Sequence, residues 1–154
     1  MKTNLKEFNY QNKIIRAIIC KPSNSTKKLY LMIPGFGRSG VSEKKFKRLS
    51  DLLITNDFST LRIDFLGNGI SDGEFRFTTV DELTKQMIFI LQKLNEEEYE
   101  VEGIIAHSLA GCVVANLINL GYKFNKILLL APALNQKNLQ RYWFTQKMMK
   151  PQKN

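Results

Sequence analysis

The sequence lacks acidic residues over its final third. All 14 Asp and Glu residues lie at or before Glu102, and residues 103–154 carry seven basic residues and no acidic one. Histidine is almost absent as well, since His107 is the only one among 154 residues. Among these 154 residues, chemistry that needs a carboxylate from the final third is therefore excluded, and His107 is the single imidazole available.

Cysteine is scarce, and long apolar runs are missing. Cys20 and Cys112 have neither metal-ligand spacing nor the density of a disulfide scaffold, so we expect two free thiols, no bound metal and no cofactor. No apolar run approaches the ~20 residues that a membrane-spanning helix needs. Residues 1–7 lack the apolar core of a secretory signal. We therefore expect a cytoplasmic protein without a membrane span.

The composition is that of one globular domain with a basic balance. Hydrophobic residues make up 44% and charged residues 24% of the chain, which is ordinary for a soluble protein. The net charge is +9, but 17 of the 23 basic residues are scattered lysines. No recognisable nucleic-acid-binding module accompanies them. We therefore predict no nucleic-acid partner.

Apolar strands alternate with amphipathic helices along most of the chain. Short apolar or β-branched runs predict strands over residues 29–33, 60–65, 101–106 and 126–131. Helical spacing of apolar residues predicts helices over residues 42–55, with Ser42 as N-cap, 80–94 and 109–120. Residues 5–10 and 13–20 are predicted to form a β-hairpin. This alternation indicates an α/β fold, with a mostly parallel sheet, helices on both faces and an N-terminal β-hairpin.

One serine stands where a predicted strand runs directly into a predicted helix. The segment GIIAHSLAG covers residues 103–111, and Ala106 and Ala110 flank Ser108 two residues away on either side. A nucleophile elbow needs small residues there, because bulky neighbours would collide across its strained turn. Taken alone, the segment is as compatible with a chance strand–helix junction as with an active site.

Three further segments follow predicted strands in a set order. They are IPGFGRSG at residues 33–40, RIDFLGNGISDG at residues 62–73 and ILLLAPA at residues 127–133. Together with the serine segment, they resemble the N-terminal portion of the α/β-hydrolase superfamily, especially its esterase and serine-aminopeptidase-like branch. The resemblance extends from residue 29 to about residue 135. Within the segment at residues 62–73, Asp64 and Asp72 are expected to play structural roles by hydrogen-bonding local backbone.

The resemblance implies a serine hydrolase that acts on esters or related acyl compounds. It implies that Ser108 is the nucleophile and that the main-chain N–H groups of Phe36 and Leu109 form the oxyanion hole. Two departures from the family pattern are Ala106 and Ala110, which replace the glycines of G-x-S-x-G. A third is a proline at position 34, where a histidine often opens the oxyanion segment.

The rest of the catalytic triad has no candidate in the sequence. In this superfamily the acid and the histidine follow the serine along the chain. His107 directly precedes Ser108 and is expected to point away from it, with a role in packing or in a backbone hydrogen bond. We therefore expect the isolated chain to be inactive, as a truncated or split hydrolase. The expected partners are a small acyl or ester substrate and either a second polypeptide that supplies the acid and the histidine or another copy of the chain at the open edge of the sheet. The alternative is a non-catalytic binding or interaction module built on the same sheet.

The chain is predicted to divide into two parts. Residues 1–135 form a partial α/β-hydrolase domain that ends after the strand following the nucleophile helix. Residues 136–154 form a basic amphipathic tail, interpreted as the start of a lid-like segment.

Overall fold

The computed structural model describes residues 1–135 and residue 137. The predicted tail, apart from Lys137, lies outside the described residues. The elements in chain order are β1 (Lys2–Tyr10), β2 (Lys13–Lys21), β3 (Lys28–Ile33), α1 (Lys44–Thr55), β4 (Ser59–Asp64), the 3-10 helix η1 (Phe75–Phe77), α2 (Val80–Glu96), β5 (Glu100–His107), α3 (Ala110–Asn119) and β6 (Lys126–Leu130).

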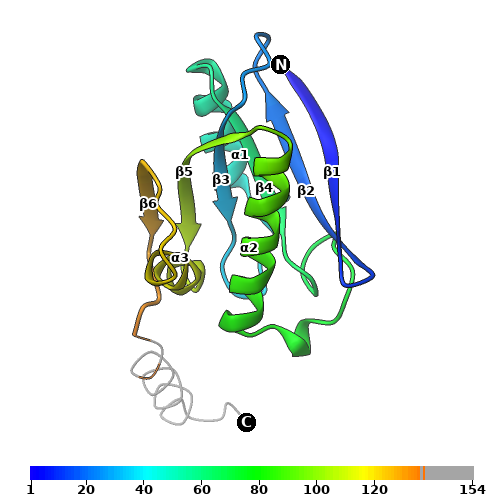
Figure 1. The fold of residues 1–154 in the computed structure, drawn as a ribbon, viewed down its shortest axis with the longest axis vertical. Coiled ribbons are helices and arrows are strands. Elements are labelled where there is room, and N and C mark those ends of the chain that lie inside the picture. Colours follow the sequence, from blue (N-terminus) through cyan, green and yellow to red (C-terminus); the bar gives the residue numbers. More distant parts are fainter. Residues whose placement is uncertain (136, 138–154) are drawn as a thin grey trace, which may run out of the picture.

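The strands form one six-stranded sheet in the order β1-β2-β4-β3-β5-β6 (Figure 1). β1 and β2 make an antiparallel hairpin, and β2 pairs antiparallel with β4. The pairings of β3 with β4, of β3 with β5 and of β5 with β6 are parallel. Gln11 and Asn12 turn the hairpin with φ of 51° and 60°, which is the positive-φ pair of a type I′ turn. The predicted mostly parallel sheet with an N-terminal hairpin is confirmed.

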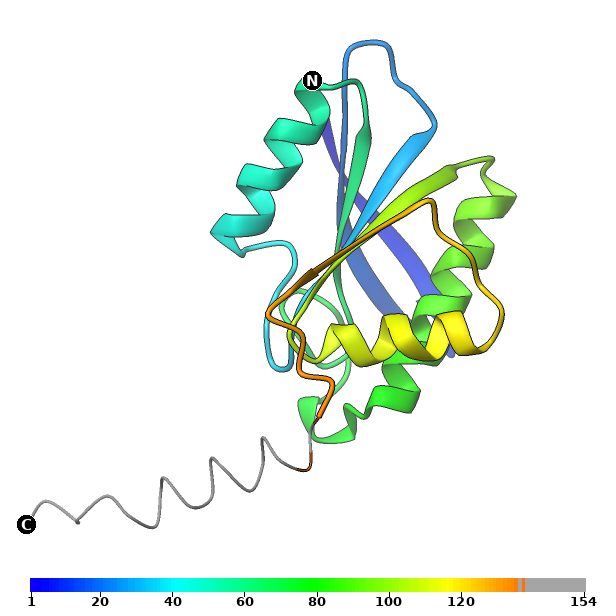
Figure 2. The same ribbon diagram turned by 90° about the vertical axis from the view of Figure 1, so that its left-hand side faces the viewer.

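Helices cover both faces of the sheet, as predicted. Figure 2 shows α1 on one side of the sheet and α2 and α3 on the other. Side chains alternate between the two faces along β3, so Leu31 joins the core under α2 and α3, while Met32 packs with Phe46 of α1. The apolar face predicted for α2 is buried throughout: Leu83, Met87, Ile90, Leu91 and Leu94.

The start of α1 differs from the prediction. The helix begins at Lys44, and its N-cap is Glu43, which makes no side-chain capping hydrogen bond. Ser42 is therefore not the cap, because the extended backbone continues through Glu43 with ψ of 121°. The Ser42 N–H instead donates to Ser39 Oγ at 3.0 Å.

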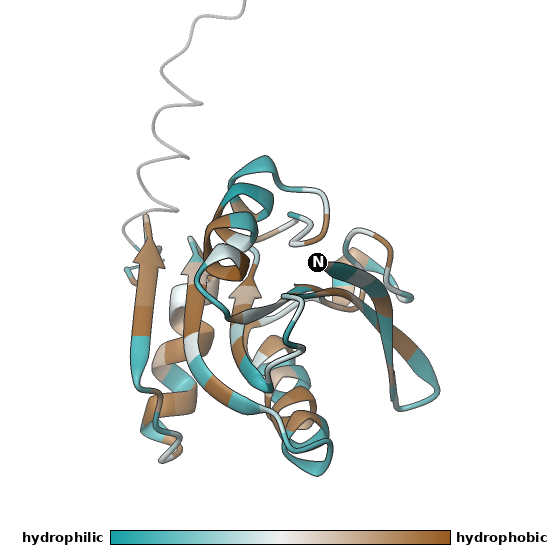
Figure 3. Cartoon of the chain, turned by 90° about the horizontal axis from the view of Figure 1, so that it is seen from above, coloured by the Kyte–Doolittle hydropathy of each residue, from teal (hydrophilic) through white to brown (hydrophobic). Residues whose placement is uncertain are grey.

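The last strand is incompletely covered in the part of the chain that the structure describes. β6 pairs there only with β5, and it lies at the border of the sheet in Figure 3. Ile127 and Leu128 are 41% and 44% exposed. Consecutive residues point to opposite faces of a strand, so both faces of β6 leave apolar surface open. On the α1 face, side chains of α1, β5 and β6 line an open groove of about 390 Å³.

Among the described residues, none of the helices has both the length and the apolar character that crossing a membrane requires.

Candidate active site

Ser108 occupies the junction between β5 and α3 in a left-handed backbone conformation. β5 ends at His107, α3 begins at Ala110, and the φ of Ser108 is 53°. A residue with a Cβ pays roughly 1–3 kcal/mol for a sparsely populated conformation, and such conformations gather at functional sites. The junction is therefore a strained strand–turn–helix unit, with Ser108 at the turn between β5 and α3.

Three backbone hydrogen bonds hold Ser108 in this conformation. Its N–H donates to the carbonyl oxygen of Leu130 at 3.0 Å. Its own carbonyl oxygen accepts from the N–H groups of Gly111 and Ala133, each at 3.0 Å. The first turn of α3 and the end of β6 with its following loop thus fix the serine from two directions.

Gly35, in the loop after β3, touches the same junction. β3 and β5 pair in parallel with Ile33 opposite Ala106, so both strands end at the same edge of the sheet. A Cβ placed on Gly35 would lie 3.1 Å from the Cβ of Ser108. Only a residue without a side chain permits this approach without a shift of the neighbours, which brings the loop at residues 33–40 against the serine.

Both main-chain N–H groups named from the family resemblance lie beside this contact. Phe36 directly follows Gly35, and Leu109 directly follows Ser108. Within residues 1–135 and 137, no backbone hydrogen bond engages the N–H of Phe36 or of Leu109. The two segments that meet at Ser108 therefore each contribute one backbone N–H without a backbone acceptor among the described residues.

The loop after β6 closes the other side of the junction. A Cβ on Gly111 would lie 3.0 Å from Pro132 Cβ. The thiol of Cys112 donates to the carbonyl oxygen of Ala133 at 3.2 Å, so this side chain contacts the loop after β6. Within the described residues, Cys20 and Cys112 form no disulfide.

Asp64 joins the loops that follow β3 and β4. The carboxylate is fully buried at the end of β4. One oxygen accepts from Ser39 Oγ at 2.9 Å and from the Ile70 N–H at 3.0 Å, and the other accepts from the Val41 N–H at 3.1 Å. A Cβ on Gly69 would collide with this carboxylate, so the glycine is required there. The predicted structural role of Asp64 is met by partners in both loops.

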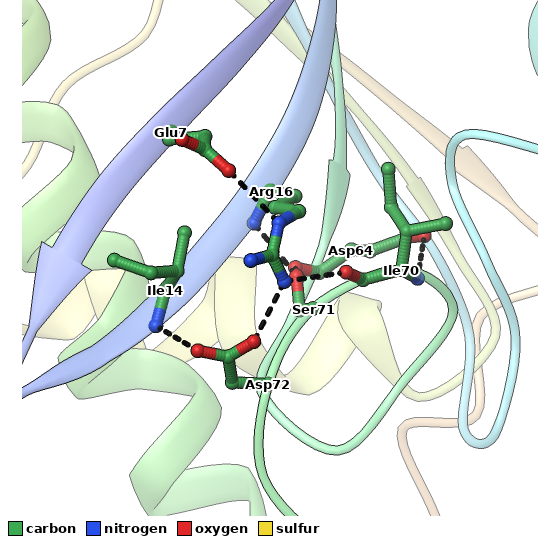
Figure 4. A network of polar contacts seen from close by, with 7 residues as sticks. All are labelled: Glu7, Ile14, Arg16, Asp64, Ile70, Ser71 and Asp72. Carbon is green, nitrogen blue, oxygen red and sulfur yellow. Dashed lines mark hydrogen bonds and ion pairs between the residues drawn. The ribbon is translucent and has the colours of Figure 1, made fainter.

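Asp72 is bound to the N-terminal hairpin (Figure 4). Its carboxylate accepts from the Ile14 N–H at 2.9 Å and pairs with the Arg16 guanidinium at 2.7 Å. The pKa of Asp72 lies below its usual range. The largest cause is the hydrogen bond from the Ile14 N–H, and the next is the hydrogen bond from Arg16. Arg16 also bonds to Glu7 across the hairpin at 2.9 Å. Asp72 therefore anchors its loop to β2.

His107 packs against Gly35 and carries an unsatisfied nitrogen. A Cβ on Gly35 would lie 3.0 Å from Nδ1 of the imidazole. This Nδ1 is buried and has no hydrogen-bond partner among the described residues, so the hydrogen bond considered from the sequence is not made at this atom. His107 therefore packs against the loop at residues 33–40, as a packing role predicts.

The surroundings of His107 favour its neutral form. Burial is the largest cause that lowers the pKa of the imidazole. The positive charges of Lys45 and Arg38 lower this pKa further, and the negative charge of Glu43 opposes them. No hydrogen bond between His107 and Ser108 side chains occurs in residues 1–135 and 137.

Sequence reasoning missed one aromatic contribution to this edge of the sheet. The 3-10 helix η1 brings the Phe75 ring to a centroid distance of 4.7 Å from the Phe36 ring. The only local signal was the FRF run directly after the turn at residues 71–74. Nothing in that run indicates which loop its rings will face.

The sheet order, the helices on both faces and the strained serine after the central parallel strands define an α/β-hydrolase fold. Residues 24–153 match the family described as "Serine aminopeptidase, S33". The chain belongs to this family. A search among curated proteins gave no match.

Solved structures share the fold at low sequence identity. Est1E from Butyrivibrio proteoclasticus, solved with ferulic acid bound, has a TM-score of 0.77 and 21% identity over 89% of this chain. The Pyrococcus furiosus esterase Pf2001 has a TM-score of 0.81 and 16% identity over 98% of this chain. Mouse alpha/beta hydrolase domain-containing protein 10 has a TM-score of 0.74 and 21% identity over 94% of it. The matches span only 56%, 60% and 57% of those chains.

Proposed function

We propose that this chain is the nucleophile-bearing part of a serine hydrolase that acts on esters or related acyl compounds. Ser108 Oγ attacks the acyl carbon, and the main-chain N–H groups of Phe36 and Leu109 donate to the oxyanion that forms. The observation that carries the proposal is the left-handed backbone of Ser108 at the β5–α3 junction, with a φ of 53°.

The local geometry supports these assignments. Three backbone hydrogen bonds maintain the strained serine, although any residue with a relaxed backbone could join a strand to a helix. Gly35 brings the Phe36 loop against Ser108, so each proposed donor directly follows one of the two residues in this close contact. Among the neighbours, Pf2001 is named an esterase and Est1E binds ferulic acid, a carboxylic acid.

The proposed reaction needs a base that these residues do not provide. A serine hydroxyl is a weak nucleophile at neutral pH and requires a base within hydrogen-bond reach. The Nδ1 of His107 faces Gly35, and Asp72 is bound to Ile14 and Arg16. We therefore propose that a further segment supplies an acid and a histidine, either as more of the same polypeptide or as a second one.

The open border of the sheet offers such a segment a place to bind. The outer side of β6 can accept another parallel strand, because its backbone groups have no neighbour there among the described residues. The apolar groove between α1 and β6 can accept a helix that completes this face of the sheet. The solved neighbours extend well beyond the part that this chain matches.

Ester hydrolysis by the completed protein tests the proposal. The chain would be co-expressed with the reading frame that follows it, and p-nitrophenyl acetate hydrolysis would be measured for wild type and for Ser108→Ala. We expect turnover only in the co-expressed protein, and its loss in the Ser108→Ala variant. Turnover that survives this substitution would refute the role of Ser108.

The second candidate function is a non-catalytic binding module. It is favoured by the exposed apolar side chains of β6 and by the lack of a base for Ser108 among the described residues. In that case the reading frame that follows would be unrelated, and no ester would be hydrolysed by either preparation. A partner protein bound at β6, without any Ser108-dependent chemistry, would support this alternative.

A further inference from the structure

Two half-exposed phenylalanines face each other at the edge of the sheet that holds Ser108. Phe36 is 55% exposed and Phe75 is 40% exposed. Their rings lie 4.7 Å apart with an interplanar angle of 58°, which is a favourable tilted arrangement. The rings come from different loops, one after β3 and one after β4. The fold therefore brings two apolar rings together and leaves both accessible.

The aromatic pair is built into the loop that touches the serine. Gly35, the residue before Phe36, makes the close approach to Ser108. Gly37, the residue after Phe36, has a φ of 63°, and a Cβ there would lie 3.5 Å from the Phe75 ring. The loop is thus in contact with Ser108 on one side of Phe36 and with Phe75 on the other. A group bound on the rings lies next to the proposed oxyanion donor.

The charged residues on either side of Phe75 interact with groups other than the Phe36 and Phe75 rings. Glu74 and Arg76 form an ion pair with each other at 2.9 Å. The Arg76 guanidinium lies over the Phe77 ring at 4.8 Å, and Phe77 is not part of the Phe36–Phe75 contact. Among the described residues, no charged side chain is stacked on the pair, which therefore presents apolar carbon suited to an uncharged apolar group.

The size of the surface fits a small ligand better than a polypeptide. A phenylalanine side chain buries about 150–250 Å² when fully covered, so these partly exposed rings offer roughly 200 Å² between them. A stable protein interface buries about 800 Å² on each partner. One aromatic ring of a ligand matches the available area.

We propose that the Phe36–Phe75 pair binds an aromatic group of the ester substrate, which makes aryl or arylalkyl esters the preferred substrate class. This inference rests on the proposed function, because the pair is a substrate site only if Ser108 is the nucleophile and the Phe36 N–H is an oxyanion donor. The ring of the substrate stacks on the pair, and the ester carbonyl then lies between Ser108 Oγ and the oxyanion donors. Esters with only small alkyl groups lose this contact.

The test measures binding without chemistry. In the Ser108→Ala background, the dissociation constant of benzyl acetate is measured by amide NMR titration and compared with that of ethyl acetate. We expect benzyl acetate to bind more tightly and to shift the amide signals of residues 35–37 and 75. Phe75→Ala should weaken benzyl acetate binding about three- to tenfold, the range expected for loss of one aromatic contact, and should leave ethyl acetate binding unchanged.

Phe77→Ala is the matched control. Phe77 belongs to the same 3-10 helix and is 60% exposed, but it lies outside the aromatic pair. Its removal should leave benzyl acetate binding unchanged. Equal losses for Phe75→Ala and Phe77→Ala, or equal affinities for the two esters in the Ser108→Ala parent, would overturn the proposal. If Phe75→Ala does not fold by circular dichroism, Phe75→Leu repeats the test with the apolar volume retained and the ring removed.

The failure of this inference can be told apart from the failure of the proposed function. Selective aryl binding without Ser108-dependent hydrolysis in the completed protein leaves a ligand site but refutes the hydrolase. Hydrolysis without aryl preference keeps the hydrolase and refutes the aromatic site. If Phe75→Ala instead dissociates a dimer in light scattering, the pair is an interface between copies and the substrate site is refuted.

Discussion

Asp64 should contribute several kilocalories per mole to stability, because its buried carboxylate joins the loop after β3, which contacts Ser108, to the loop after β4. In Asp64→Ala, the Ser39 hydroxyl and the N–H groups of Val41 and Ile70 all lose their acceptor. A hydrogen bond to a charged group contributes about 1.5–3 kcal/mol net, and neighbouring bonds are not additive. We therefore expect the free energy of unfolding to fall by about 4 kcal/mol. Since domains of this size are stable by roughly 5–15 kcal/mol, the variant should remain only marginally folded.

Urea unfolding followed by circular dichroism measures this loss through linear extrapolation. Asp64→Asn keeps one acceptor oxygen and should lose about half as much. Asp51→Ala removes an exposed carboxylate on α1 and serves as the control, with an expected change within about 0.5 kcal/mol. A loss below about 1 kcal/mol for Asp64→Ala, or one equal to the control, would refute the assigned role of the carboxylate.

Three further predictions concern the junction and the sheet border. Because the folded-state pKa of His107 lies below 6.5, the unfolded chain binds its proton first, so stability should fall as pH drops below about 6.5. His107→Gln should flatten this part of the pH–stability curve; an unchanged slope would contradict the lowered pKa. Gly35→Ala crowds His107 and Ser108 at 3.0 and 3.1 Å and should cost about 1–3 kcal/mol in the same urea assay; a neutral effect would show that the loop is not held there. The open border of β6 should make the isolated chain associate with rising concentration in light scattering, and Leu128→Lys should reduce this; a wild-type monomer at all concentrations would count against it.

The elements of this fold were predictable because their signals are local. The central strand needed only the apolar run at residues 29–33, and α2 needed only the helical spacing of its apolar residues. The hairpin followed from β-branched runs on both sides of Gln11 and Asn12, whose positive φ values the structure provides. The predicted start of α1 was wrong because serine is a residue type that favours the N-cap, whereas the backbone stays extended through Glu43.

The contacts of the candidate site could be predicted only where they involve neighbours in sequence. Small residues at two-residue spacing singled out Ser108 in the sequence, and the structure gives it a left-handed backbone with a φ of 53°. The pairing of Arg16 with Asp72 joins residues 56 positions apart, so no local pattern could indicate it. The contact of Phe36 with Phe75 likewise depends on how two loops fold over one sheet edge. Long-range placement of side chains is a property of the assembled sheet.

Labelling of Ser108 by a fluorophosphonate probe, read by intact-protein mass spectrometry and peptide mapping, tests the central claim most directly. The comparison requires the isolated chain, the chain co-expressed with its following reading frame, and the Ser108→Ala variant of each. We predict no labelling of the isolated chain, because no described residue provides a base for Ser108, and stoichiometric labelling at Ser108 in the completed protein. Strong Ser108-dependent labelling of the isolated chain, abolished by His107→Gln, would contradict this account and identify His107 as the base.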